Sequence, residues 1–385
     1  MRWKKVKLKE LYEVHNGLSK GRKYFGTGYP FLSFSTVFNN YFIPDEITDF
    51  VQSTEKEQEN YSIKRGDVFV TRTSETSDEL GMSCVALKDY PKATYNGFTK
   101  RMRPITGKLL PEYVGYYMRL PSFRAGFQAF STMTTRASLR NEDLLSLQIA
   151  VPPIDVQEKI AGILGAYDDL IENNKKQIIL LEEIAQRLYR EWFVDLHFPG
   201  YEDVEIVNGV PEGWSNAQLD MVGKFRRGRT ITRADIVDGD VAVVAGGIEP
   251  AYYNNVSNTE APVITISASG ANAGFVRMYY KRVWASDCSY VDKNHTNHIY
   301  YLYCFLKDNK VRIDNLQKGA AQPHVYAKDI NALEMLVPSS DLLTSFDSAA
   351  EPIFTKIKSC DEIIERNIQM RDKLLPYLMI GKLEV

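Results

Sequence analysis

Apolar residues recur at every third or fourth position along residues 152–195, and charged or amide residues fill the positions between them. The spacing keeps a seven-residue period for roughly four heptads, as in the buried seam between two packed helices. The pattern predicts one long helix that buries a narrow apolar stripe against another helix. The seam positions are Ile160, Leu164, Tyr167, Ile171, Asn174, Ile178, Leu181 and Leu188.

Two further features describe this predicted helix. Residues 151–153, Val-Pro-Pro, cannot continue a preceding element, and Asp155 with Glu158 is typical of a capping-box start. Asn174 interrupts the seam, and such a residue usually fixes helix register and partner number at a cost in stability. A second interpretation is a solvent-facing helix side that drifts out of register, because 3.6 residues per turn do not match a strict heptad.

A second stripe with the same spacing runs through residues 338–385. Two helices of similar length with matching seams are expected to pack on each other as an up-and-down pair. Pro376 predicts that the second helix kinks or ends in its last turn. The seam positions of this helix are Ile353, Ile357, Ile364, Leu374 and Leu378.

The segments that precede the two helices are two copies of one unit. Each copy mixes short strand-like runs with Gly, Pro and Asn turns, and then contains an aromatic, helix-like segment. At a constant offset of 211 residues, the matches are Trp3, Leu8, Leu11 and Gly17 with Trp214, Leu219, Val222 and Gly228. Nearer the helices the offset becomes 186 residues, as for Tyr117 and Tyr303.

These patterns predict an α+β fold. Two mixed α/β domains in a pseudo-two-fold arrangement are joined by two long helices that pack as an antiparallel coiled coil. Each domain of this 385-residue chain is large enough to bury its own core. The predicted order is first domain, residues 1–151; first long helix, residues 152–195; linker and second domain, residues 196–337; second long helix, residues 338–385.

The composition is that of a soluble globular protein, with 44% hydrophobic and 25% charged residues. No apolar run approaches the ~20 residues that a membrane helix needs, and the basic N-terminus lacks the apolar stretch of a signal peptide. The four cysteines lie far apart and suggest no disulfide framework. A cytoplasmic protein is expected.

No catalytic or metal centre stands out. The chain has no Gly-x-x-x-x-Gly-Lys-Ser/Thr phosphate loop, and the glycine run at residues 25–28 is followed by Tyr-Pro, so we expect a turn there. Four residues of metal-binding type occur close together, but their spacing matches no usual structural zinc pattern. These four are Cys288, His295, His298 and Cys304. We therefore predict no catalytic residue, no metal ligand and no cofactor bound by this chain.

The distribution of charge indicates binding. The net charge is only -2, but the first thirty residues, residues 97–108 and residues 223–233 are strongly basic. Arg and Lys beside turn-rich segments are the side chains that hold phosphates and read base edges. For any one of them the alternative is a solvated surface charge. The DNA-binding candidates are Lys20, Arg22, Lys23, Arg72, Lys100, Arg101, Arg103, Arg136, Arg226, Arg227, Arg229, Arg233, Arg277, Lys281, Arg282, Gln322 and His324.

The whole chain resembles the DNA-specificity subunit of type I restriction-modification systems. The resemblance rests on VPPIDVQEKIAGIL at the start of the first helix and RLYREWF near its end. The linker FPGYEDVEIVNGVPEGW and the terminal LLPYLMIGKLE are also similar to that family. It implies that each globular unit is a target-recognition domain for one half of a bipartite double-stranded DNA sequence.

The resemblance also implies partners. The paired helices would act as a ruler and as the docking surface for two copies of an adenine methyltransferase subunit, which brings S-adenosylmethionine. A motor-nuclease subunit, which uses ATP and Mg2+, would join to cut unmodified DNA. One alternative is a protein- or glycan-binding scaffold that dimerises through its coiled coil. A less favoured one is a nuclease built on Asp45, or on Glu158 with Lys159.

Overall fold

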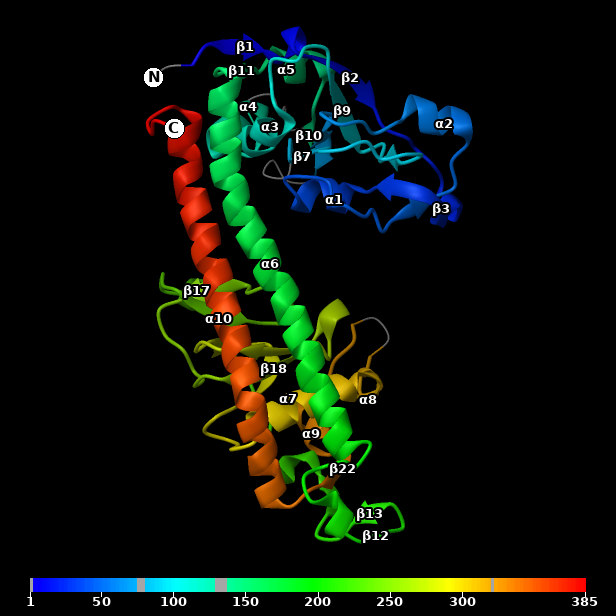
Figure 1. Cartoon of the computed structure of the whole chain (residues 1–385), viewed down its shortest axis with the longest axis vertical. Coiled ribbons are helices and arrows are strands. Elements are labelled where there is room, and N and C mark those ends of the chain that lie inside the picture. Colours follow the sequence, from blue (N-terminus) through cyan, green and yellow to red (C-terminus); the bar gives the residue numbers. More distant parts are fainter. Residues whose placement is uncertain (1–2, 75–79, 129–136, 320–321) are drawn as a thin grey trace. The chain divides into compact units, whose positions relative to one another are not determined.

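The computed structural model describes residues 3–74, 80–128, 137–319 and 322–385. The chain divides into two compact units, of which unit 1 comprises Met1–Ile171 and Glu365–Val385, and unit 2 comprises Glu172–Ile364. Both units mix helices with small sheets, as the sequence predicts (Figure 1). Two helices of 40 residues each, α6 (Ile154–Phe193) and α10 (Ser340–Met379), contribute residues to both units.

Unit 1 is built on small sheets whose strands come from distant parts of the sequence. Its antiparallel four-stranded sheet has the order β2-β9-β5-β7, and a three-stranded sheet has the order β4-β3-β8. The strands of these sheets are β2 (Tyr12–Asn16), β3 (Phe25–Leu32), β4 (Phe50–Val51), β5 (Val68–Thr71), β7 (Ser83–Val85), β8 (Thr94–Tyr95) and β9 (Thr99–Pro104). Two-stranded ribbons pair β1 (Lys5–Lys7) with β11 (Gln148–Ala150), and β6 (Thr73–Ser74) with β10 (Ala137–Ser138). The helices besides the long pair are α1 (Phe34–Asn39), α2 (Glu55–Asn60), α3 (Pro111–Met118), α4 (Pro121–Gln128) and α5 (Asn141–Ser146).

Unit 2 repeats this pairing scheme. Its four-stranded sheet has the order β15-β21-β18-β19, and its three-stranded sheet has the order β17-β16-β20. These strands are β15 (Arg226–Arg227), β16 (Val241–Val244), β17 (Tyr252–Asn254), β18 (Val263–Ser267), β19 (Val276–Tyr279), β20 (Trp284–Ala285) and β21 (Cys288–Asp292). Two-stranded ribbons pair β14 (Ser215–Gln218) with β22 (Glu334–Val337), and β12 (Ile206–Val207) with β13 (Val210–Pro211). The short helices are α7 (Ile299–Asp308), α8 (Lys310–Asp314) and α9 (Ala327–Asn331).

The repeat extends to the kind of pairing. In unit 1, β3 pairs antiparallel with β4 and parallel with β8. In unit 2, β16 likewise pairs antiparallel with β17 and parallel with β20. A position in one unit can therefore be matched to a position in the other through strand register.

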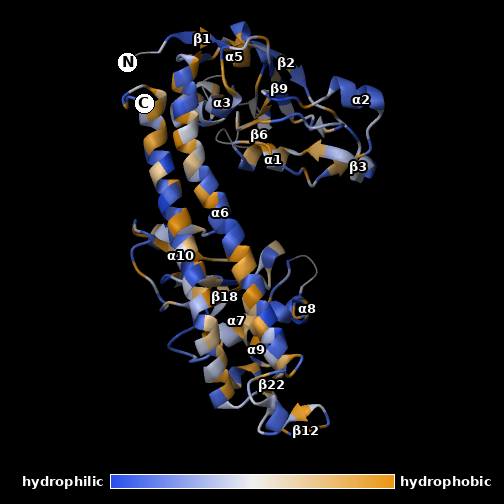
Figure 2. Cartoon of the chain, viewed as in Figure 1, coloured by the Kyte–Doolittle hydropathy of each residue, from blue (hydrophilic) through white to orange (hydrophobic). Residues whose placement is uncertain are grey.

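The long helices share a hydrophobic core with each unit's sheets. In unit 1, Ile160 and Leu164 of α6 lie in one cluster with Leu375 and Leu378 of α10. In unit 2, Ile357 of α10 belongs to the core cluster. Figure 2 shows orange and blue segments alternating along both helices. The seam residues that are buried, with at most 9% exposure, are Ile160, Leu164, Ile171, Asn174, Ile357, Ile364 and Leu378, while Tyr167, Ile178, Leu181, Leu188, Ile353 and Leu374 are half-buried.

Two local expectations differ from the structure, the capping residue of α6 and the turn at residues 25–28. Helix α6 begins at Ile154, so Asp155 lies in its first turn and is not the capping residue. The carbonyl oxygen of Pro153 accepts from the backbone N–H groups of Val156 and Gln157. Helix α10 ends at Met379, within one turn of Pro376. The glycine run at residues 25–28 lies inside β3, where a register shift and the left-handed Gly26 and Gly28 accommodate it. Within the described ranges, no helix is long and apolar enough to cross a membrane.

Candidate nucleic-acid interface

Two of the basic candidates in unit 1 are neutralised by carboxylates. Lys20 donates to Glu57 at 2.8 Å and to the backbone oxygen of Gln52 at 2.6 Å. Arg103, on β9, donates to both carboxylate oxygens of Asp67, at 2.8 Å and 2.6 Å. The hydrogen bond that Arg103 donates to Asp67 raises the pKa of Arg103 above its ordinary value. Because these charges are already paired, they are less available to DNA than a free cation.

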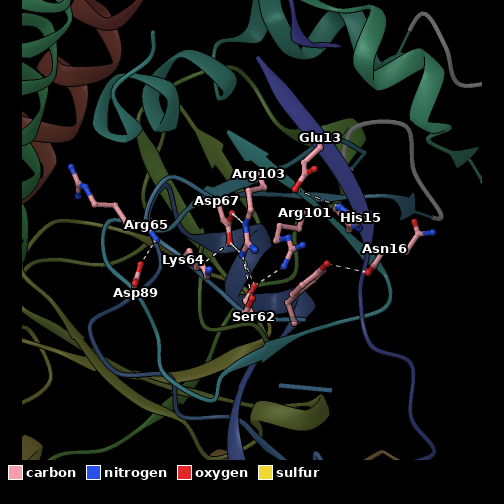
Figure 3. Close-up of polar contacts among 11 residues, drawn as sticks. Glu13, His15, Asn16, Ser62, Lys64, Arg65, Asp67, Asp89, Arg101 and Arg103 are labelled. Atoms are coloured by element: carbon pink, nitrogen blue, oxygen red, sulfur yellow. Dashed lines mark hydrogen bonds and ion pairs between the residues drawn. The ribbon is translucent and has the colours of Figure 1, made fainter. Parts of the chain in front are cut away.

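Arg103 belongs to a polar network on one face of β9 (Figure 3). Asp67 is fully buried and also accepts from the backbone N–H of Lys64 at 2.8 Å. The carbonyl oxygen of Ser62 accepts from Arg101 at 2.7 Å and from Arg103 at 3.0 Å. Arg101 also lies over the ring of Tyr95. Both arginines therefore hold the segment that leads into β5, and their role is to position it.

Lys100 precedes Arg101 on β9, and successive side chains of a strand point to opposite faces. Its ammonium group donates to Asn16 at 3.3 Å and to Asn141, and only 6% of the residue is exposed. Burial lowers the pKa of Lys100, and the nearby charge of Arg72 lowers it further. Arg72 itself lies between β5 and β6, held through its backbone by Phe98 and Leu139.

The three-stranded sheet of unit 1 and the short 3-10 helix Arg22–Tyr24 that leads into β3 present aromatic and basic side chains together. Tyr24 and Tyr29 are 37% and 38% exposed. The ammonium of Lys23 lies 5.1 Å from the centre of the Tyr24 ring, and that of Lys92 lies 5.5 Å from the centre of the Tyr29 ring. Arg22 is exposed beside them. Cations over aromatic faces, left open to solvent, suit contacts with phosphates and nucleotide bases.

The equivalent sheet of unit 2 carries the same kind of surface. Arg229 lies 5.9 Å from the ring of Trp284, whose indole N–H donates to the backbone of Arg229 at 2.8 Å. Arg233 lies 6.0 Å from the ring of Tyr252. The neighbouring Tyr253 is 56% exposed. Both arginines are exposed, and no carboxylate pairs with them among the described residues.

The remaining candidates of unit 2 differ in how far they are engaged. Arg282 forms an ion pair with Glu260 at 3.1 Å. Arg277 lies over Tyr279 and donates to the carbonyl of Ile248 at 3.0 Å. The exposed candidates are Arg226, Arg227, Lys281 and Gln322, while His324 is half-buried, stacks on Tyr326 and exchanges backbone hydrogen bonds with Lys318. Arg136 lies outside the described residues.

Four contributors to these surfaces were not predicted from the sequence. Asn16 and Asn141 contact Lys100, while Lys92 and Trp284 complete two cation-aromatic pairs. None of them lies in a basic run of the sequence, so no local pattern pointed to it. The pairs became visible only through strand pairing, because their members are far apart in the sequence.

The four residues of metal-binding type are buried or contact carboxylates. Cys288 and Cys304 are buried, and burial raises the pKa of the Cys288 thiol to about 12. His295 contacts Asp292 at 2.5 Å, and His298 contacts Asp347 at 3.1 Å. Across the described ranges, no group of three or more His, Cys, Asp or Glu side chains is placed to hold a metal ion.

Comparisons with known proteins agree on one family. The family model for the type I restriction modification DNA specificity domain matches residues 1–183 and 211–363. The chain is 25% identical to the type I restriction enzyme MjaIX specificity subunit of Methanocaldococcus jannaschii, over 100% of this chain and 94% of that protein. It is 23% identical to the HindI specificity subunit of Haemophilus influenzae, over 94% of this chain and 96% of that protein. The solved S subunit of a type I restriction-modification system from M. genitalium has a similar fold, with a TM-score of 0.57, 16% identity, and coverage of 98% of this chain and 96% of that one.

Proposed function

Because this chain belongs to the family of type I restriction-modification DNA specificity subunits, we propose that its two units are target-recognition domains, each reading one half of a bipartite DNA sequence. The chain is non-catalytic, as specificity subunits of these systems are. The relatives give no support to a protein- or glycan-binding scaffold.

One observation carries the assignment of a half-site to each unit. The two units repeat one pairing scheme, and the three-stranded sheet of each presents exposed aromatic rings with cations over them. A repeated surface of one kind suits a repeated ligand of one kind, the two halves of a duplex target. Phosphate contacts from the exposed arginines and lysines would set the position of each unit, and polar side chains would read the bases.

We propose that α6 and α10 form an antiparallel coiled coil that spaces the two units in a pseudo-two-fold arrangement. Forty helical residues extend roughly 60 Å at 1.5 Å per residue. Half-sites one turn apart on B-DNA are separated by about 34 Å. Helices of this length are therefore long enough to hold two readers over base pairs that neither reads.

The proposed partners follow from the family. Two copies of an adenine methyltransferase subunit would dock on the helices and bring S-adenosylmethionine, and a motor-nuclease subunit would use ATP and Mg2+. Apolar side chains on the outer side of α6 support such docking: Leu180 and Ile184, one turn apart, are 58% and 51% exposed. Because this surface is apolar and exposed, a protein partner would remove it from water.

The test is to co-express this chain with the adenine methyltransferase subunit encoded beside it and to map N6-methyladenine genome-wide by single-molecule sequencing. The expected result is one bipartite motif with a fixed gap, methylated once on each strand. An assembled complex of the two proteins that produces no motif would contradict the assignment. A methyltransferase expressed without this chain is the control, and it should produce no bipartite motif.

A further inference from the structure

The side chain of Lys100 is unusual among the cations of unit 1. The residue is only 6% exposed, and within the described part of the chain its ammonium group donates to the side-chain amides of Asn16 and Asn141. Asn16 is the residue that pairs with Lys100 between β2 and β9, and Asn141 is the first residue of α5. Both asparagines are exposed. Lys100 therefore forms the recessed floor of a small polar site with two amides at its rim.

Among the residues that the structure describes, no carboxylate contacts the ammonium group of this site. Arg103, three residues further along the same strand, is neutralised by the buried carboxylate of Asp67, whereas no carboxylate pairs with Lys100 among the described residues. A second cation, Arg72, is close enough to lower the pKa of Lys100, and its buried Nε has no hydrogen-bond partner within the described ranges. Burying a cation without an anion is unfavourable. An electron-rich ligand bound at this site would offset the free-energy cost of burying the cation.

The chemistry of the site is that of hydrogen-bond donors. A lysine ammonium has three donor hydrogens and no acceptor, so each asparagine must turn its amide oxygen toward Lys100. The amide nitrogens of Asn16 and Asn141 then lie at the far ends of the same groups, and no described residue accepts from them. The free donors of the site are one ammonium hydrogen and the amide N–H groups of the rim.

A set of donors selects one base. In the major groove, guanine alone presents two acceptors, O6 and N7, while adenine and thymine mix an acceptor with a donor or a methyl group, and cytosine presents a donor. A phosphate would also accept, but the exposed Arg22 and Lys23 already suit that role, and a recessed donor oriented by two amides suits a fixed acceptor. We propose that Lys100, with Asn16 and Asn141, reads the O6 and N7 edge of a guanine in the half-site bound by unit 1, an inference that rests on the proposed function.

The equivalent place in unit 2 supports this interpretation. Asn16 and Lys100 form the last residue pair of β2 and β9, and Arg227 and Ser289 form the last pair of β15 and β21. The scaffold is shared, yet the polar residues at this register differ between the units. Two units that read different half-sites are expected to differ at base-reading positions and to agree in the surrounding fold.

The experiment compares the methylation motif of the wild-type complex with that of a Lys100→Met complex, mapped genome-wide. Methionine keeps the length of the lysine stem and removes the donor. We expect the motif to become degenerate at a single guanine position of one half-site, with discrimination there reduced roughly tenfold or more, while the other half-site is unchanged. The unchanged half-site reports that the chain is folded and assembled. Lys88→Met is the matched control, because Lys88 is exposed and paired with Asp45, and it should leave the motif intact.

Two results in the motif assay would overturn the inference: an unchanged motif at wild-type efficiency, or weaker methylation at every site without a change in base preference, which would indicate a phosphate contact. If the Lys100→Met complex methylates nothing, the inference is tested by a binding measurement on the wild-type complex. The wild-type complex is titrated with duplexes in which each guanine of the target is replaced in turn. The replacements are 7-deazaguanine, which lacks N7, and 2-aminopurine, which lacks O6. Insensitivity to both analogues at every guanine would overturn the inference. A wild-type complex without any motif would refute the proposed function itself.

Discussion

Asp168 on α6 accepts a hydrogen bond from Arg371 on α10 at 2.6 Å, and the same carboxylate accepts from the hydroxyl of Tyr116 on α3 at 2.5 Å. Arg371 also lies over the ring of Tyr41, 5.1 Å from its centre. One carboxylate therefore ties both long helices to the globular part of unit 1.

Replacing Arg371 with methionine tests this tie. The side chain of Arg371 is 13% exposed and that of Asp168 is 28% exposed, so the contact is only partly screened by water. We expect the free energy of unfolding of unit 1 to fall by about 1.5–3 kcal/mol, the usual range for a lost hydrogen bond to a charged group. Denaturant titration of the full chain measures the change. Lys176→Met is the control: it removes an exposed i,i+4 pair with Glu172 and should change the free energy of unfolding by less than about 0.5 kcal/mol. If both variants lose the same free energy of unfolding, the Arg371 contact contributes no more than an exposed ion pair.

Arg103→Met should be the more damaging change within the sheet. It leaves the carboxylate of Asp67 buried and without its cation, a defect that usually costs about 3 kcal/mol or more. Native-state hydrogen exchange at the amides of β5 and β9 would report the loss locally. Arg140→Met is the control, because the Arg140 side chain is 74% exposed and its pair with Asp143 is screened. Retention of full protection in Arg103→Met would mean that Asp67 finds another partner.

Lys100→Met should have the opposite effect on stability. The pKa of Lys100 is lowered from its ordinary value of 10.5 by burial, so the folded state disfavours the charged form. At pH 7 the lysine is charged in both states and the full penalty applies, so removing it should raise the free energy of unfolding of unit 1. The advantage should shrink as pH rises toward 10.5, where the wild-type lysine also loses its proton. Thermal unfolding at pH 7 and pH 10 provides the comparison; a variant that is less stable at pH 7 would show that Lys100 serves the fold.

The length of the helices should set the spacer of the DNA target. Deleting one heptad from α6 and the matching heptad from α10 removes about 10 Å from each helix at 1.5 Å per residue. With base pairs about 3.4 Å apart, the gap in the methylated motif should shorten by about three base pairs. Mapping the motif of the doubly deleted chain decides the matter, and the same gap as in the wild type would refute the ruler role.

Partner docking should depend on the outer apolar face of α6. The double variant Leu180→Gln and Ile184→Gln keeps good helix formers but removes exposed apolar surface, so we expect weaker association with the methyltransferase subunit and unchanged folding. Co-purification and analytical ultracentrifugation of the mixed proteins measure association. Val311→Gln is the control, because Val311 is 72% exposed on α8 of the same unit. Equal association of the double variant and the wild type would place docking elsewhere.

The local pattern of the sequence determined the elements that depend on local spacing. A heptad of apolar residues specifies a helix with one buried stripe, so both 40-residue helices and the burial of Ile160, Leu164 and Ile357 followed from periodicity alone. The internal repeat was visible for a similar reason, since two copies of a fold conserve the spacing of their apolar and glycine positions. Family membership followed from these motifs and from the order in which they occur.

Only the tertiary structure decided which cations are free to bind. Lys20 and Arg103 looked the same as Lys100 in the sequence, but their carboxylate partners lie 37 and 36 residues away and reach them through folding. Lys100 and Arg101 are neighbours in the chain, yet strand alternation sends one to the asparagine site and the other to Ser62. Charge neutralisation and recognition surfaces depend on strand register between distant segments, and the spacing of residues along one segment carries no information about that register.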